Sequence, residues 1–236
     1  MYRRLDPDLL VATIERLAVR IAARFPQSDL LNVCGELAAL GRDSAKRAEH
    51  LGRPNWALRI CVMLIVVAGF GVFLYLAARL DFDPGTRSLF TLVQSVDALF
   101  NLAVLAGAAV VSLLSIETRL VRARAGKALH PIRAMVHIID MHQLTKDPGM
   151  AGLAHLKTSV SPPRDLSPFE LTRYLDYCSE MLSLTAKLAA LIALATEDAV
   201  IAGAVNDIET LAGTIAQKIW QKIMIADVGV SPAEAD

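Results

Sequence analysis

Nineteen consecutive residues between Arg59 and Arg79 carry no charge, ICVMLIVVAGFGVFLYLAA. As an α-helix at ~1.5 Å per residue this stretch would be about 28 Å long, close to the hydrocarbon thickness of a bilayer. A second apolar run extends from Leu92 to Ile116 and contains one charged residue, Asp97. The sequence therefore predicts two membrane-spanning helices, over about residues 58–79 and 92–116.

Basic residues flank the two runs on their outer sides. They are Arg42, Lys46, Arg47, Arg53 and Arg59 before the first run, and Arg119, Arg122, Arg124, Lys127 and Arg133 after the second. The connecting loop holds only Arg79 and Arg87, which Asp81 and Asp83 balance, and it contains the turn signal Asp83-Pro84-Gly85. The positive-inside rule then places both termini in the cytoplasm and the short loop outside, so the spans form an antiparallel hairpin.

The second predicted span contains two features that can serve packing or transport. Gln94, Asp97 and Asn101 share one helix face and form a polar membrane face, which can meet the interface or line a pore. Ala103 and Gly107 are four residues apart, and such small residues let helix backbones approach closely. This approach can occur against the first span of the same chain or against another subunit, and the sequence leaves both open.

The segments outside the two runs show helical periodicity and no strand alternation. Residues 8–24 and 29–51 are amphipathic, with a break at Phe25-Pro26-Gln27-Ser28, where Ser28 can cap the second helix. After the second span we expect the helix to continue over residues 117–129, and Pro131 either kinks it or begins a new helix. Lys146-Asp147-Pro148-Gly149 should end it, and residues 150–166 should form a loop.

Two long helices are predicted in the C-terminal part. Ser167, Pro168 and Glu170 form the Ser-x-x-Glu capping box of a helix that runs to about residue 195. Thr196 can cap a final helix that ends near residue 225. Both helices have apolar residues in steps of three and four, as in a coiled coil, so we expect an antiparallel pair. The apolar residues outside these seams, such as Leu175 and Ile192, need a further partner, which can be the N-terminal helices, residues 131–145 or another subunit.

Side chains that could catalyse a reaction or bind a metal are few. His130, His137 and Asp140 can share a helix face and are weak candidates for a metal or proton site, whereas His142 would point elsewhere. Three scattered cysteines form no CxxC or zinc spacing, and nucleotide and nucleophile motifs are missing. We therefore expect no enzyme activity and no cofactor. The net charge of zero gives no electrostatic case for nucleic-acid binding.

Taken together, these patterns predict an all-α protein with four segments. These are an N-terminal cytoplasmic helical hairpin (1–56), a transmembrane hairpin (57–118), a basic juxtamembrane helix (119–149) and a C-terminal cytoplasmic helix pair (150–236). Arg119, Arg122, Arg124 and Lys127 should contact anionic lipid headgroups. Arginine outnumbers lysine and alanine is abundant, which favours a GC-rich bacterium and its inner membrane.

Three functional hypotheses follow, ordered from the one that the sequence supports best to the one that it supports least. The first is a membrane-anchored helical scaffold or interaction protein that self-associates or binds a cytoplasmic partner. The second is an oligomeric pore-forming effector or small ion channel lined by the second span. The third is a membrane-embedded enzyme or metal protein that uses the segment from His130 to His142.

Overall fold

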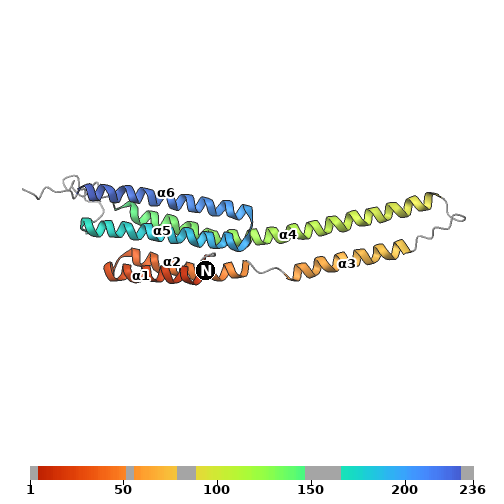
Figure 1. Ribbon diagram of the computed structural model, residues 1–236, viewed down its shortest axis with the longest axis horizontal. Coiled ribbons are helices and arrows are strands. Elements are labelled where there is room, and N and C mark those ends of the chain that lie inside the picture. The colour runs from red at the N-terminus through yellow and green to blue at the C-terminus, as the bar shows by residue number, and fades with distance from the viewer. Residues whose placement is uncertain (1–4, 52–55, 79–88, 147–165, 230–236) are drawn as a thin grey trace, which may run out of the picture. The chain divides into compact units, whose positions relative to one another are not determined.

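The computed structural model describes residues 5–51, 56–78, 89–146 and 166–229, and it is helical with no strand in these ranges. The helices are α1 (Pro7–Arg24), α2 (Asp29–Leu51), α3 (Trp56–Ala78), α4 (Leu89–Leu144), α5 (Pro168–Thr196) and α6 (Ala199–Gly229) (Figure 1). The all-α prediction is confirmed. The predicted turn at residues 83–85 and loop at 150–166 lie almost wholly outside the described residues.

The chain divides into two compact units. One consists of Met1–Gly52 and Arg124–Asp236, and we call it the bundle. The other is Arg53–Ala123, and we call it the apolar unit. Helix α4 contributes its first part to the apolar unit and its last part to the bundle.

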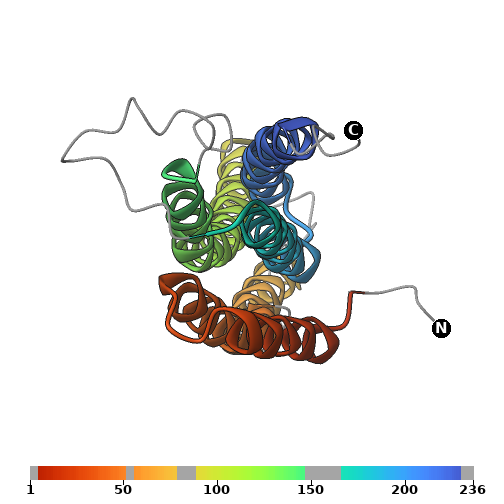
Figure 2. The same ribbon diagram turned by 90° about the vertical axis from the view of Figure 1, so that its left-hand side faces the viewer.

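Helix α5 is the centre of the bundle. It packs against α6, α2 and α1, and α1 also packs against α2. In the end-on view of Figure 2, α5 lies between the α1–α2 pair and the pair formed by α6 and the last part of α4. Large side chains without solvent exposure come from α1, α2, the last part of α4 and α5, and Ile219 of α6 joins them in the same cluster: Ile14, Leu17, Ile21, Leu30, Leu37, Ile132, Ile139, Leu175, Met181, Leu182, Leu188 and Ile192. The bundle therefore has one continuous core rather than separate cores for its two halves.

The α1–α2 pair is held closely against this core. On α2, Gly41 leaves room for α1 and α5, because a Cβ added there would lie 3.2 Å from Ile14 Cδ1 and 3.8 Å from Leu188 Cδ2. At the surface Arg20 forms an ion pair with Glu180 of α5, and Arg42 pairs with Glu15 of α1. Exposed pairs of this kind contribute about 0–1 kcal/mol each, so the apolar core carries most of the stability.

Local capping explains where several bundle helices begin. Asp6 accepts hydrogen bonds from the N–H groups of Asp8 (2.9 Å) and Leu9 (3.3 Å) at the start of α1. At the start of α5 the predicted capping box is present: Ser167 accepts from the Glu170 N–H, and Glu170 accepts from the Ser167 N–H. These bonds satisfy N–H groups that have no partner within the first turn of a helix.

Two local predictions need correction, and one open alternative is settled. Thr196 does not cap the last helix, because it still belongs to α5 and its hydroxyl donates to the Ile192 and Ala193 carbonyls. Asp198 caps α6 instead, accepting from the Val200 and Ile201 N–H groups after Glu197 breaks the helix at a φ of 48°. Ser28 donates its hydroxyl to the Phe25 carbonyl rather than accepting from the next helix. Of the two alternatives for Pro131, a kink or the start of a new helix, the second is excluded, because Pro131 lies inside one continuous helix.

Candidate functional site

Helix α3 and the first part of α4 expose large apolar side chains. On α3 they include Met63 and Leu64, which are 68% and 64% exposed, and on α4 they include Phe100 and Leu105, which are 67% and 69% exposed. Exposure of apolar surface to water costs roughly 25 cal/mol per Å², and large exposed apolar surfaces mark sites of interaction with proteins or membranes. This surface is the main candidate for function in the apolar unit.

Among the described residues, three helices are long and apolar enough to cross a membrane by length and composition. They are Val96–Leu144 of α4, Pro168–Thr196 of α5 and Ala199–Ile225 of α6. The apolar stretch described for α3, Arg59–Tyr75, is shorter. Composition alone therefore does not separate membrane helices from core helices in this chain.

Burial does separate them. Half of the most apolar stretch of α5 and 28% of that of α6 are buried inside the protein, whereas none of that of α4 is. The buried apolar residues of α6 as a whole form one inward stripe: Ile201, Val205, Ile208, Ala212, Ile215, Ile219 and Ile223. The inward apolar residues of α5 and α6 are therefore buried in the bundle core, whereas no residue in the most apolar stretch of α4 is buried.

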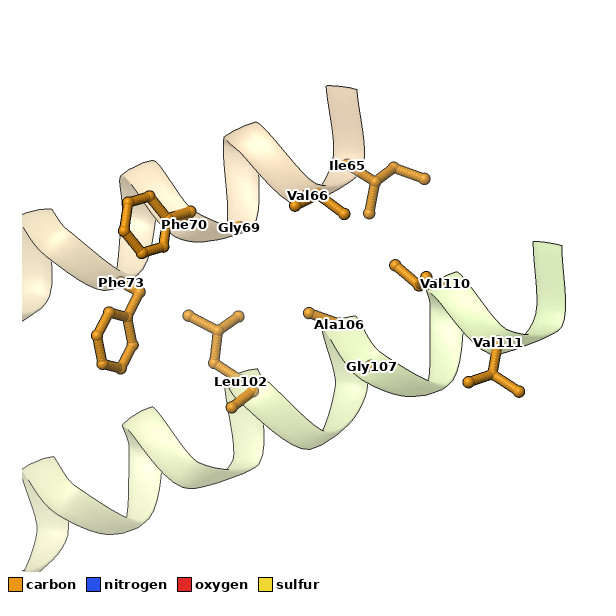
Figure 3. Close-up of a pocket in the computed structure, with 11 residues that line it drawn as sticks. Ile65, Val66, Gly69, Phe70, Phe73, Leu102, Ala106, Gly107, Val110 and Val111 are labelled. Atoms are coloured by element: carbon orange, nitrogen blue, oxygen red, sulfur yellow. The ribbon is translucent and has the colours of Figure 1, made fainter. Parts of the chain in front are cut away.

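Helices α3 and α4 border an apolar groove of about 460 Å³. Figure 3 shows Leu102, Ala106 and Val110 projecting from α4 toward α3, which contributes Ile65, Val66, Gly69, Phe70 and Phe73 to the lining. Gly69 faces Ala106, since a Cβ added at Gly69 would lie in ordinary van der Waals contact with the Ala106 Cβ, at 3.8 Å. The pairing of Gly69 with Ala106 was not predicted from the sequence, although both are small residues within apolar runs.

The two predicted packing residues take a different position. Ala103 and Gly107 also line the groove, yet a Cβ added at Gly107 would meet nothing within 4 Å. Within the chain, Gly69 and Ala106 therefore face each other, and Gly107 has open space beside its backbone.

A hydrogen bond joins two residues of the predicted polar face, Asp97 and Asn101. Asn101 Nδ2 donates to Asp97 Oδ2 at 3.2 Å, and both side chains are exposed, as is Gln94. A carboxylate and an amide on the surface of an otherwise apolar helix are costly in lipid unless they meet water, headgroups or another polar group.

The basic segment is exposed along α4. Arg119, Arg122, Arg124 and Lys127 all have exposed side chains, so their charges can reach a partner outside the chain. No acidic residue occurs between Glu117 and Asp140.

The histidine and carboxylate candidates are not assembled into a site. His130 and His137 are exposed, and seven residues of helix separate them by about 10 Å, too far to share a metal ion within one chain. Asp140 accepts from Gln143 Nε2 at 2.7 Å, and Gln143 in turn accepts from Lys222 Nζ of α6 at its carbonyl and at Oε1. In the part of the chain that the structure describes, no three His, Cys, Asp or Glu side chains are grouped to hold a metal.

The bundle cysteines are shielded from reagents. Burial raises the pKa of the Cys34 thiol to about 11 and that of the Cys178 thiol to about 12. Because the thiolate is the reactive form, both should react slowly at neutral pH. Cys61 on α3 is exposed.

Comparisons with protein-family models, with curated proteins and with solved structures find no match to this chain. The functional argument therefore rests on its own residues.

Proposed function

We propose that the protein is a membrane-anchored helical interaction module. Helix α3 and the first part of α4 form a two-span hairpin, and the bundle works on the cytoplasmic side as a scaffold that self-associates or binds a protein partner. The membrane is the inner membrane of a bacterium, and both termini are cytoplasmic.

One observation carries this proposal: no residue of the most apolar stretch of α4 is buried, while half of that of α5 and 28% of that of α6 are buried. In water the exposure of these apolar side chains would cost much free energy. In lipid the same side chains lie in an apolar environment, and the helix forms its backbone hydrogen bonds internally. The bundle, by contrast, already buries the inward faces of its helices.

The basic residues support the orientation. Arg119, Arg122, Arg124 and Lys127 are exposed directly after the second apolar run. Near an anionic leaflet each such side chain gains roughly 1 kcal/mol, so these residues both set topology and bind headgroups.

The topology is tested with a reporter that is active only outside the cytoplasm. It should be active when inserted near Pro84 and inactive at either terminus, and the protein should remain in membranes after alkaline extraction. A C-terminal fusion that is active outside the cytoplasm would contradict the two-span arrangement. Release by alkali would contradict membrane insertion altogether.

A second candidate function is an oligomeric pore lined by the second span, and the exposed Asp97–Asn101 pair favours it. A pore would give this polar pair water instead of lipid. In reconstituted bilayers Asp97→Asn should then change ion conductance, with Ser115→Ala, on the same helix, as the matched control. The anchor hypothesis expects no conductance from any form of the protein.

A further inference from the structure

The apolar groove between α3 and α4 leads toward two charged residues at one end. Val66 and Val110 both line the groove near that end (Figure 3). Arg59 precedes Val66 by seven residues and Glu117 follows Val110 by seven, which is about two turns of helix in each case. Both charged residues therefore lie on the groove side of their helices, about 10 Å beyond the valines. This end of the groove has a cation on α3 and an anion on α4.

The two charges do not neutralise each other. Arg59 is exposed and Glu117 is half-exposed, and no ion pair joins them in the part of the chain that the structure describes. Trp56, three residues before Arg59, is 68% exposed. Tryptophan is enriched where a membrane meets water, so this end of the groove should lie at the depth of the lipid headgroups. A ligand that reaches both charges needs an anionic group for Arg59 and a cationic group for Glu117.

The groove itself suits a hydrocarbon chain. All 11 residues that line it are apolar or glycine, so its occupant needs no hydrogen bond there. Spread over the rise from Leu102 to Val111, about 13.5 Å, its volume of 460 Å³ corresponds to a cross-section of roughly 34 Å². An α-helix with its side chains is at least ~10 Å across, which is about 80 Å². The groove is therefore too narrow for another helix, whereas hydrocarbon chains, whose carbons pack about 4 Å from their neighbours, fit into it.

We propose that the groove and its charged end bind a phospholipid with an amine headgroup, phosphatidylethanolamine. An acyl chain occupies the groove, the phosphate accepts hydrogen bonds from the Arg59 guanidinium, and the ammonium group donates to the Glu117 carboxylate. The paired N–H donors of arginine match phosphate oxygens, and an ammonium group has three donors for a carboxylate. This inference rests on the proposed function, because it requires α3 and the first part of α4 to lie in a bilayer.

This site differs in its ligand from the basic segment that follows it on α4. The basic segment offers only cations and so favours purely anionic headgroups. Glu117 repels such a headgroup and attracts the ammonium of phosphatidylethanolamine. Phosphatidylglycerol, which has the phosphate without the amine, is therefore the lipid that distinguishes the two sites.

The first test changes the headgroup contact. The full-length chain in mild detergent is titrated with phosphatidylethanolamine or with phosphatidylglycerol, and native mass spectrometry measures the affinity for the first bound lipid. Glu117→Gln should lower the affinity for phosphatidylethanolamine about fivefold, which corresponds to ~1 kcal/mol, and should not lower that for phosphatidylglycerol. Glu117→Asp should keep the parent's preference. Glu209→Gln, the same change at an exposed position of α6, should alter neither affinity.

The second test fills the groove. A Cβ added at Gly107 meets nothing within 4 Å, so leucine can enter the groove there without displacing α3. If Gly107→Leu displaces two methylene groups of the acyl chain, the affinity for phosphatidylethanolamine should fall about tenfold. Ala108→Leu is the matched control, because Ala108 is exposed on the same helix and outside the groove lining. All variants are compared at the helical content of the parent, measured by circular dichroism.

The outcomes separate this inference from the proposed function. Equal effects of Glu117→Gln and Glu209→Gln would overturn the headgroup contact, and equal effects of Gly107→Leu and Ala108→Leu would overturn the groove as the lipid site. If Gly107→Leu changed the native mass of the protein rather than its lipid affinity, the occupant would be a second copy of the chain and the lipid site would be refuted. Each of these results leaves the membrane anchor intact. Release of the protein from membranes by alkali would overturn the anchor itself.

Discussion

Helices α4 and α5 both contain stretches apolar enough to cross a membrane, yet the chain uses them differently. Half of the stretch in α5 is buried by neighbouring helices, and none of that in α4 is. Helix α5 also carries charges that find partners at the bundle surface, such as Glu180 with Arg20 and Asp176 with Arg173. The comparison teaches that hydropathy measures how apolar a helix is. Whether its apolar side chains are buried or exposed depends on which of them the other helices of the chain cover.

The largest effect is expected from an arginine placed on the exposed apolar surface of α4, compared with an arginine on the exposed surface of α1. Leu105 on α4 and Val19 on α1 are 69% and 70% exposed, so neither substitution disturbs a core. If α4 crosses lipid, Leu105→Arg should cost about 3–4 kcal/mol at the centre of the span. Molecules with an active C-terminal reporter outside the cytoplasm should then accumulate.

Val19→Arg is the matched control and should leave insertion and stability within ~0.5 kcal/mol of the parent, because its side chain faces water. Equal tolerance of both substitutions would remove the difference between the two surfaces and, with it, the argument for the second span.

The next effect concerns the bundle core. Leu188 of α5 has no solvent exposure and lies beside Gly41 of α2, whereas Leu194 of the same helix is 63% exposed. Leu188→Ala should destabilise the bundle by about 3 kcal/mol through lost burial and the cavity left behind. Leu194→Ala should change stability by less than ~0.5 kcal/mol.

Maleimide labelling of Cys34 and Cys178 in denaturant measures this unfolding directly, since both thiols are buried in the folded bundle. If Leu194→Ala proved as damaging as Leu188→Ala, the exposed end of α5 would have a partner beyond the described chain.

Periodicity and capping predicted much of the bundle from the sequence. The predicted bounds of α2, residues 29–51, are those observed, and the predicted seam of α5 is buried along its length. These features succeed because they depend on residues within one or two helical turns. The cap of α6 failed for the same reason, since Thr196 and Asp198 are both suitable caps and only the length of α5 decides between them.

What the sequence could not provide is which surfaces meet. The excess apolar residues of α5, including Leu175 and Leu182, left three possible partners open, and the structure packs α5 against α1 and α2 as well as α6. The His130, His137 and Asp140 candidates share one stretch of helix, but Asp140 is engaged with Gln143 and the two histidines face outward. Contacts between distant segments depend on tertiary packing, which a local pattern does not contain.

The smallest effect tests whether the predicted capping box at the start of α5 contributes to the stability of the bundle. Ser167→Ala removes the hydroxyl that accepts from the Glu170 N–H at 3.3 Å, so the start of α5 should lose ~1 kcal/mol of stability. Ser183→Ala on the same helix is the control. Its Oγ only accepts from Lys187 Nζ at the surface, and its loss should change stability by less than ~0.5 kcal/mol.

The pH dependence of the Ser167→Ala effect gives a second readout. Hydrogen bonds from the Ser167 hydroxyl and N–H lower the pKa of Glu170 below its usual value. A carboxyl whose folded-state pKa is lowered stabilises the fold above its unfolded pKa and loses that contribution as the pH falls through the folded value. The difference between parent and Ser167→Ala in denaturant midpoint should therefore be full at neutral pH and shrink under acidic conditions. A difference that grew on acidification would mean that Glu170 acts through some group other than this capping box.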